Sequence, residues 1–253
     1  MNRTSTAVRA VTQASSFLKA QFRTVHKGIK KPDGTLVSAA DHGAEKIVLS
    51  ALKKAFPNDG ILSEESREVP SKNGYRWILD PLDGTHNFLA GIPIFGTLLA
   101  LEKDGEVIAA SCVFPILDEI FVAEKGKGAF LNGKRIHVSR AKTLAGSVFL
   151  ADGNRNLEFN TIVRDIRSFK SKGCRFRMLG EGPFGMTRVA LGSVLTAVMR
   201  RVKIWDVAAP VLVVREAGGR VSDLKGGDWS LDSSALLATN GHIHKEALRL
   251  LKS

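Results

Sequence analysis

Two carboxylates, a glycine and a threonine stand close together in the segment WILDPLDGTHNF. Its apolar start predicts a strand that ends at Asp80, and the proline that follows predicts a turn leading into a helix. One Asp at such a junction is explained as a helix cap, but a second, Asp83, is not. Crowded carboxylates repel each other unless a cation lies between them, and oxygen ligands favour magnesium, manganese or calcium over zinc. We therefore predict a divalent metal site, at which the backbone N–H groups of Gly84 and Thr85 could receive a phosphate.

Three further acids each have an ordinary explanation when they are taken singly. Asp41 and Asp206 both precede a predicted helix, where an Asp commonly caps the first turn. Glu64, in ILSEES, could be a charge on a surface loop. A role for these acids in the metal site depends on evidence that they converge.

The elements that must position these groups begin with two amphipathic helices, predicted from apolar spacing over residues 5–24 and 40–56. The segment HKGIKKPDGTLVSAAD between them predicts an exposed loop with a turn at Pro32-Asp33-Gly34, and it is a candidate for mobility. From residue 76 onward, short apolar runs and a Lys-Asp-Gly turn predict an antiparallel meander.

The second part of the chain alternates predicted strands and helices, which indicates a layered α/β arrangement. The predicted elements are the strands SVFLA and VLTAVMR and the helices at about 156–170, 183–192 and 206–217. We expect two halves, residues 1–145 and 146–253, packed into one compact unit.

Charge is the most unusual feature of the composition, because 37 Lys and Arg against 25 acidic residues give a formal net charge of +12. Such a surface attracts anions, and we favour a solvated basic surface that steers phosphorylated substrates. The alternative is a nucleic-acid or ribosomal partner, motivated by the basic stretches KSKGCRFR, RRVK and GKGAFLNGKR. No recognised nucleic-acid motif accompanies them.

The apolar runs fall short of the ~20 residues that a membrane helix needs. The N-terminus has no uninterrupted apolar region of the kind found in signal peptides, so we expect a cytoplasmic protein. Cys112 and Cys174 are too few for a disulfide framework and are expected to be reduced.

Four segments together resemble the inositol monophosphatase family. DPLDGTHNF at 80–88 and WDVAAPVLVVREAGG at 205–219 are similar to its two signature motifs. ILSEES at 61–66 is similar to its Glu-Glu loop, and VSAAD at 37–41 to its upstream Asp. The resemblance covers nearly the whole chain and implies an α+β fold, the layered α-β-α-β-α sandwich of inositol monophosphatases and sugar phosphatases.

Carried over residue by residue, the resemblance implies a set of metal ligands. These would be Glu64, Asp80, the Leu82 carbonyl, Asp83 and Asp206. It also implies that Asp41 and Thr85 orient the attacking water, and that Gly84 and Thr85 bind the phosphate through their N–H groups. The expected enzyme is a homodimeric phosphomonoesterase that uses two to three Mg²⁺ ions, with Mn²⁺ as a possible substitute.

Substrate recognition is where the chain departs from the family pattern. Met199 replaces the acid that binds inositol hydroxyls, and Glu181 replaces a small hydroxyl residue. Both are candidate substrate-binding residues, although Met199 could be core and Glu181 could point to solvent. His86 is expected at the rim of the site. Inositol 1-phosphate is the leading named substrate; histidinol phosphate, fructose 1,6-bisphosphate and adenosine bisphosphate are alternatives, and an RNA- or ribosome-associated binding protein is an alternative of another class.

Overall fold

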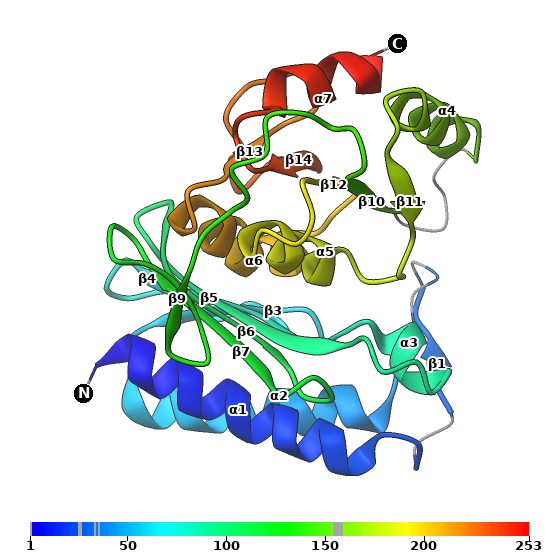
Figure 1. The fold of residues 1–253 in the computed structure, drawn as a ribbon. Helices are drawn as coiled ribbons and strands as arrows, with labels where there is room; N and C mark the ends of the chain where they lie inside the picture. The colour runs from blue at the N-terminus through cyan, green and yellow to red at the C-terminus, as the bar shows by residue number, and fades with distance from the viewer. Residues whose placement is uncertain (1, 25–26, 33, 35, 154–158, 253) are drawn as a thin grey trace.

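The computed structural model describes residues 2–24, 27–32, 34, 36–153 and 159–252 of the chain. Its layers alternate helix, sheet, helix, sheet and helix, as Figure 1 shows from bottom to top. The predicted α-β-α-β-α sandwich is therefore confirmed. Within these described ranges no helix is long and apolar enough to cross a membrane.

The first part of the chain supplies the lower helical layer and a seven-stranded sheet. Its elements are α1 (Arg3–Gln21), β1 (Ile29–Lys30), β2 (Leu36–Val37), α2 (Ala39–Ala55), β3 (Gly60–Ser63), β4 (Tyr75–Asp83), α3 (Thr85–Leu89), β5 (Gly96–Lys103), β6 (Glu106–Phe114), β7 (Glu119–Glu124), β8 (Gly128–Leu131) and β9 (Lys134–Ile136).

The remainder supplies a five-stranded sheet with helices on both of its faces. Its elements are β10 (Val148–Gly153), α4 (Phe159–Lys170), β11 (Arg175–Arg177), α5 (Gly182–Ala190), β12 (Thr196–Arg200), α6 (Ile204–Glu216), β13 (Arg220–Ser222), β14 (Ala235–Thr239) and α7 (His244–Lys252).

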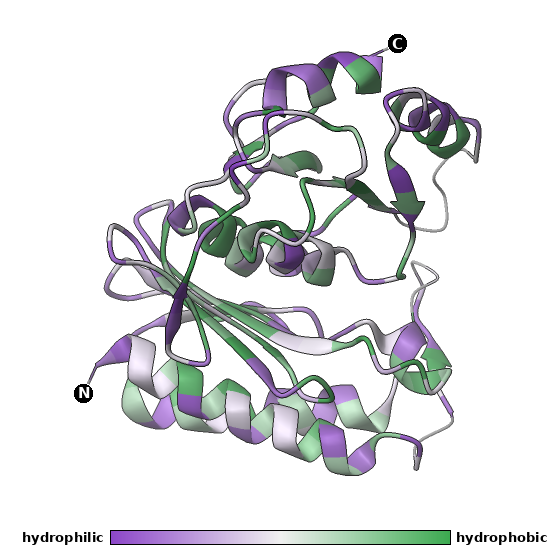
Figure 2. Ribbon diagram, in the orientation of Figure 1, coloured by the Kyte–Doolittle hydropathy of each residue, from purple (hydrophilic) through white to green (hydrophobic). Residues whose placement is uncertain are grey.

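The two predicted N-terminal helices are present as α1 and α2, and their caps explain where they begin. The Asn2 side chain accepts from Thr4 N, and Ser38 forms a capping box with Asp41. Both helices turn apolar stripes toward one face of the seven-stranded sheet, as Figure 2 shows in green. Burial of these stripes, rather than helix propensity, stabilises both helices.

The predicted antiparallel meander is present as β4-β5-β6-β7-β8-β9, with β3 added beside β4, but strand β4 does not end at Asp80 as predicted. It continues through Pro81 to Asp83, with a register shift between Asp80 and Asp83. Such a bulge leaves one residue unpaired, so a proline without an N–H can be accommodated in the strand. Strand β3 pairs in parallel with β4. It was not predicted, because its sequence GILS shows no clear alternation of apolar and polar side chains.

In the second sheet the predicted strands and helices are present, but the order β11-β10-β12-β14-β13 adds unpredicted strands. Strand β11 reads Arg-Phe-Arg and is too short and too polar for a periodicity signal. The helix expected at 156–170 is described from Phe159, and residues 156–158 lie outside the described part.

The segment before α2 is more regular than the predicted exposed loop, because β1 and β2 form a short antiparallel hairpin. The turn expected at Pro32-Asp33-Gly34 includes residue 33, which lies outside the described residues.

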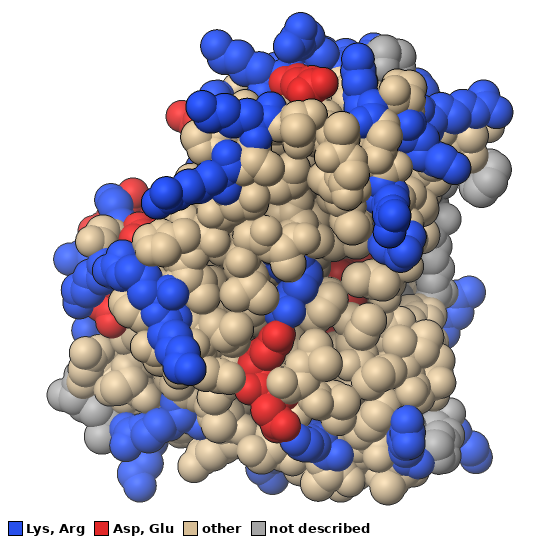
Figure 3. Space-filling model, viewed as in Figure 1, with Lys and Arg blue, Asp and Glu red and all other residues tan. Residues whose placement is uncertain are grey.

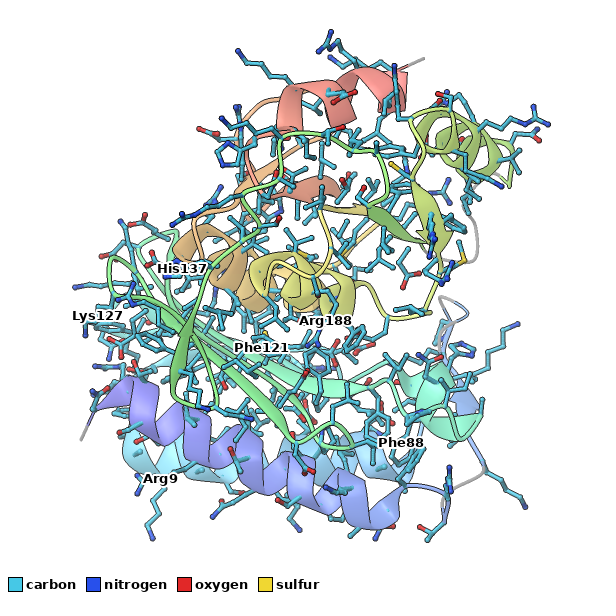
Figure 4. All side chains as sticks on the ribbon, viewed as in Figure 1. Arg9, Phe88, Phe121, Lys127, His137 and Arg188 are labelled. Carbon is cyan, nitrogen blue, oxygen red and sulfur yellow. The ribbon has the colours of Figure 1, made fainter. Side chains whose placement is uncertain are left out.

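Helices α5 and α6 lie between the two sheets and share one apolar core with both of them. In Figure 4, Arg188 of α5 extends toward Phe121 on the seven-stranded sheet. Its guanidinium lies 5.2 Å from the Phe121 ring centroid, and Nη1 donates to Glu119 at 2.8 Å. This contact fixes α5, whose first turn borders the candidate site.

The predicted division of the chain into two halves between residues 145 and 146 stays a prediction.

Candidate active site

A cavity of about 220 Å³ is lined by the carboxyl end of β4, by α3, and by the segments leading into α5 and α6. Six acidic residues line it, two of them from β4 and the others from separate segments of the chain. They are Glu64, Asp80, Asp83, Asp152, Glu181 and Asp206. The cavity therefore joins the two segments that sequence analysis singled out, which are far apart in the chain.

The bulge in β4 brings both of its aspartates to the cavity. Leu82 N donates to Asp80 Oδ1 at 3.1 Å, which holds the first carboxylate against its own turn. The Leu82 carbonyl oxygen accepts a hydrogen bond from the Thr85 hydroxyl at 3.0 Å. This carbonyl therefore lies in the same turn of the chain as Asp80 and Asp83. Asp83 follows in the strand and also lines the cavity.

Asp80, Asp83 and Asp206 converge, because one carboxylate oxygen of each lies within 4.8 Å of the others. Asp206 reaches this cluster from the first turn of α6, where it also accepts from Lys203 N at 2.8 Å. Asp206 therefore both caps the first turn of α6 and lines the cavity. The Oδ2 atom of Asp83 is buried and receives no hydrogen bond from an N–H or hydroxyl group of the described residues; its carboxyl group interacts with that of Glu181. Three oxygen donors, crowded by a further carboxyl group, fit a hard divalent cation.

Burial and mutual repulsion raise the pKa of these acids. The pKa of Asp80 is raised well above its ordinary value by burial and then by the charge of Glu64. The pKa of Asp83 is raised well above its ordinary value by burial and then by Glu181. Burial raises the pKa of Asp206 to about 7, against the hydrogen bond from Lys203 N. A site that disfavours its own carboxylate charges in this way is one that a bound cation would relieve.

Thr85 and Asp41 are brought together beside this cluster. Thr85 Oγ1 donates to Asp41 Oδ1 at 3.0 Å, and Asp41 is fully buried. Ser38 supplies the other contacts of this carboxylate, with N and Oγ at 2.7 and 2.6 Å from Asp41 Oδ2. The predicted capping role of Asp41 is therefore present together with its contact to Thr85. One hydroxyl proton cannot satisfy two acceptors fully, so a hydroxyl directed to Asp41 leaves the Leu82 carbonyl available to a cation.

Gly84 joins β4 to α3 in a conformation that suits glycine. Its φ of 81° lies in the left-handed region, and an added Cβ would lie 3.0 Å from the Ile94 carbonyl oxygen and 3.2 Å from Glu181 Cγ. The tight turn places the first N–H groups of α3 at the cavity, where Gly84 and Thr85 are both part of the lining. Backbone donors at a helix start suit an anionic ligand.

Glu64 lines the same cavity, and its carboxylate is paired with Lys31. Sequence analysis did not single out this lysine. Lys31 Nζ lies 2.8 Å from Glu64 Oε1 and also contacts Glu65. Burial lowers the pKa of Lys31, but hydrogen bonds to the two glutamates outweigh burial and raise this pKa above its ordinary value. Glu64 is therefore more than the surface charge that was considered as its alternative. The basic loop sequence gave no signal that one of its lysines would reach the site.

The two candidate substrate-binding residues have different surroundings. Glu181 is 3% exposed, so the alternative that it points to solvent is wrong. Its carboxylate accepts from Phe184 N at 2.5 Å and caps α5, and burial raises its pKa to about 7. Met199 is buried on β12, as its core interpretation required, but it also lines the cavity. His86 is exposed and lines the cavity, consistent with the rim position expected for it.

Four charged lining residues were missed as site residues by sequence analysis. They are Asp152, Arg200, Arg201 and Lys203. The stretch RRVK was considered only as part of a basic surface that could attract a nucleic acid. Asp206, which was predicted as a metal ligand, follows this stretch closely in the sequence. Its position was the one feature of the sequence that indicated that the stretch would border the site.

The comparisons with known proteins agree along the whole chain. The model of the inositol monophosphatase family matches residues 2–253. An inositol-1-monophosphatase of Rhizobium meliloti is 38% identical over 96% of this chain and 92% of its own length. A histidinol-phosphatase of Chlorobaculum parvum is 36% identical over 86% and 84%, respectively. The crystal structure of extragenic suppressor protein suhB from Bartonella henselae has a TM-score of 0.92 and 37% identity, with 98% of each chain covered. The chain belongs to the inositol monophosphatase family and is a phosphatase that acts on phosphate monoesters.

Proposed function

We propose that this protein is a magnesium-dependent phosphomonoesterase that hydrolyses a small phosphorylated metabolite at the cavity. The observation that carries this proposal is the convergence of Asp80, Asp83 and Asp206, whose carboxylates each place one oxygen within 4.8 Å of the others. These three acids, with Glu64 and the Leu82 carbonyl, would hold two to three Mg²⁺ ions, which Mn²⁺ could replace. When bound, the ions supply positive charge to the phosphoryl group and lower the pKa of water.

The chain's own groups position the nucleophile. Asp41 is fixed by Ser38 and accepts the Thr85 hydroxyl, so a water next to Thr85 can pass its proton toward a buried carboxylate. Burial raises the pKa of Asp41, which makes this carboxylate a better proton acceptor than an exposed Asp. Water can then attack phosphorus directly, and no covalent enzyme intermediate is required.

The phosphate is placed by backbone donors of the turn at Gly84 and Thr85. Phosphoryl transfer depends on positioning and on charge stabilisation more than on covalent chemistry. Fixed backbone donors in a glycine turn can bind non-bridging phosphate oxygens without the flexibility of a long side chain. The formal net charge of +12 of the whole chain favours the approach of anionic substrates.

Inositol 1-phosphate is the leading named substrate, because a relative that is 38% identical is an inositol-1-monophosphatase. Histidinol phosphate, fructose 1,6-bisphosphate and adenosine bisphosphate are the alternatives. We also propose a cytoplasmic homodimer whose two halves act as one unit, as the resemblance to the family implies.

Phosphate release from inositol 1-phosphate tests this proposal. The purified protein is first stripped with excess chelator and then titrated with Mg²⁺. We expect no release in chelator and recovery on addition of Mg²⁺. Hydrolysis that persists in chelator would refute the metal dependence, and no hydrolysis of any phosphate monoester in Mg²⁺ would refute the proposed function.

A second candidate function, nucleic-acid binding, is favoured by one surface. Six exposed basic residues lie on α4, β11 and the turn between them, and three more lie on the adjacent α7. They are Arg164, Arg167, Lys170, Lys172, Arg175 and Arg177, with Lys245, Arg249 and Lys252 on α7. Figure 3 shows blue side chains gathered where Figure 1 places α4 and α7. We call this surface the basic face. RNA binding that survives physiological salt and is lost when these residues are neutralised would support this function, whereas binding lost steadily with salt would be general polyanion attraction.

A further inference from the structure

We propose that Glu181 is a further metal ligand, which binds the same divalent cation as Asp83 through its Oε1 atom. This inference rests on the proposed function and deepens it, because it adds a carboxylate from the N-terminal end of α5 to the predicted ligands. From the sequence, Glu181 was expected to contact the substrate.

Glu181 is held in place at the start of α5. Its Oε2 atom accepts a hydrogen bond from Phe184 N at 2.5 Å, which caps the first turn of the helix. The preceding segment is attached to α3 by Asn87, whose Nδ2 donates to the Leu179 carbonyl oxygen at 2.9 Å. A Cβ added to Gly84 would lie 3.2 Å from Glu181 Cγ, so the side chain packs against the turn between β4 and α3. The carboxylate is therefore positioned before a cation binds, as an effective metal ligand requires.

The second carboxylate oxygen of Glu181, Oε1, receives no hydrogen bond. This atom is buried, and no N–H or hydroxyl group of the described residues donates to it. None of the ion pairs in the described part of the chain involves Glu181. A buried carboxylate oxygen without a donor or a cation is costly. The oxygen is therefore available to a ligand that accepts electron pairs.

The neighbour of this oxygen is another carboxyl group in the same situation. Asp83 Oδ2 is buried and also receives no hydrogen bond from an N–H or hydroxyl group of the described residues. The carboxyl groups of Asp83 and Glu181 interact with each other. Two carboxylates in contact repel each other unless a proton or a cation lies between them. A shared proton and a shared cation are thus the two arrangements that satisfy both oxygens.

A metal at Asp83 favours the shared cation. Metals bind the ionised carboxylate, so a proton between the two groups has to leave when a metal binds Asp83. At similar distances, the attraction of Glu181 to a doubly charged cation exceeds its repulsion by Asp83. The three converging aspartates supply one oxygen each, which leaves positions in the octahedral shell of Mg²⁺ for a further carboxylate oxygen.

The burial of these oxygens fits a cation better than a substrate hydroxyl. Mg²⁺ binds at about 2.0–2.1 Å from its oxygen ligands and needs less room than a hydroxylated carbon chain. The residue after Glu181 is also covered, because a Cβ added to Gly182 would lie 2.3 Å from Met199 Cε. The apolar Met199 side chain therefore packs against the start of α5, where a substrate would have to approach Oε1.

Metal binding by matched variants tests this inference without relying on turnover. Chelator-stripped protein is titrated with Mn²⁺ in the absence of substrate, and the free ion is measured by electron paramagnetic resonance. Glu181→Ser removes the carboxylate but keeps a hydroxyl that can cap α5. Glu181→Gln keeps the length of the side chain and an oxygen for Phe184 N. Asp232→Asn removes one charge at an exposed position and is the control.

We expect both Glu181 variants to raise the Kd of one Mn²⁺ ion by about 10- to 100-fold, the range found when groups that support a metal site are removed. The Kd values of Asp232→Asn should match those of the wild type. Melting temperatures without metal report whether each variant is folded, and Glu181→Gln decides the test if Glu181→Ser is not. Anomalous scattering from crystals of the Mn²⁺-loaded wild type should place one ion within ligand distance of both Glu181 and Asp83.

The sign of the change in Kd separates a metal ligand from a residue that shares a proton with Asp83. If Glu181 shares a proton with Asp83 and does not bind the metal, its removal frees Asp83, so the Kd should fall or stay the same. Either result would overturn the inference. An unchanged Kd with a raised KM would assign Glu181 to the substrate and would overturn it as well.

The proposed function is judged separately, by phosphate release from the wild type in Mg²⁺. Hydrolysis by a wild type whose Mn²⁺ affinity does not depend on Glu181 would overturn the inference and leave the phosphatase intact. Weaker Mn²⁺ binding in both Glu181 variants, with no hydrolysis of any phosphate monoester by the wild type, would support the inference and refute the proposed function. A wild type that binds no divalent ion would refute both.

Discussion

The hydroxyl of Thr85 lies 3.0 Å from a carboxylate oxygen of Asp41, although the two residues are 44 positions apart. One residue begins α3 and the other lies in the first turn of α2, so the contact joins two helix starts beside the acidic cluster. Each residue has a local structural role, but their contact is explained by neither role alone. The contact places the Thr85 hydroxyl next to a buried proton acceptor, where both groups can orient the proposed attacking water.

Loss of the Thr85 hydroxyl should damage catalysis more than structure. We expect Thr85→Ala to lower kcat by about 10² to 10⁴-fold, the usual range for a lost acid–base element. Mg²⁺ affinity, measured by calorimetry, should change little, since the backbone groups and the carboxylates remain. Thr85→Ser keeps the hydroxyl and serves as the matched control. A Thr85→Ala enzyme with an unchanged kcat would remove this residue from the mechanism.

Neutralising Asp83 should separate metal binding from folding. Asp83→Asn keeps the shape of the side chain but removes a charge that burial and Glu181 already disfavour. We predict near-complete loss of activity and a metal-free melting temperature equal to or above that of the wild type. Asp232→Asn, at an exposed position, is the control and should change neither quantity. A large drop in metal-free stability would instead make Asp83 a structural residue.

Lys31 should weaken metal binding by competing for Glu64. Its ammonium lies 2.8 Å from Glu64 Oε1, where it offsets the charge that a metal would otherwise meet. We expect Lys31→Met to lower the apparent Kd for Mg²⁺ several-fold by calorimetry, because a cation repels a cation. Lys30→Met removes an exposed lysine from the same hairpin and should leave the Kd unchanged. Equal affinities in the two variants would show that Lys31 has no influence on the metals.

The metal-free protein should lose stability as pH rises toward neutrality. Burial raises the pKa of Asp206 from 3.8 to about 7 and that of Glu181 from 4.5 to about 7. An acid that binds its proton more tightly when folded stabilises the fold at low pH, and this contribution is lost as pH rises through the folded pKa. In chelator, the melting temperature should therefore fall between about pH 4 and pH 7, and the fall should be smaller in Asp83→Asn, which removes an acid whose own pKa burial raises well above its ordinary value. A melting temperature that rises across this range would contradict the raised pKa values.

Family order and local motifs both mark Asp80, Asp83 and Asp206, and the structure brings these three acids together, while their role as metal ligands stays a prediction. The sequence also predicted the long helices and the meander, since apolar periodicity reports directly on burial. The extension of β4 to Asp83 was missed because a proline ordinarily ends a strand, and only the pairing with β5 shows that a bulge absorbs it. Local patterns carry no information about that partner strand.

Residues that reach the site from distant surface segments were not predictable in this way. Lys31 belongs to a basic loop and Arg200 to a basic stretch, and each looks like an ordinary solvated charge in the sequence. Their roles depend on long-range partners, Glu64 for the first and Asp165 for the second. Glu181 was placed near the substrate by alignment, but its burial as the cap of α5 required the tertiary structure.

Occupancy of the acidic cluster by a divalent ion, measured together with catalysis, tests the central claim most directly. Mn²⁺ bound by the stripped protein can be followed through the electron paramagnetic resonance signal of the free ion, while phosphate release is assayed in the same samples. We predict that activity rises with bound Mn²⁺ in the wild type, and that Asp83→Asn and Asp206→Asn lose both bound ion and activity. Full phosphatase activity in samples with no bound metal, or undiminished Mn²⁺ binding in both variants, would contradict it.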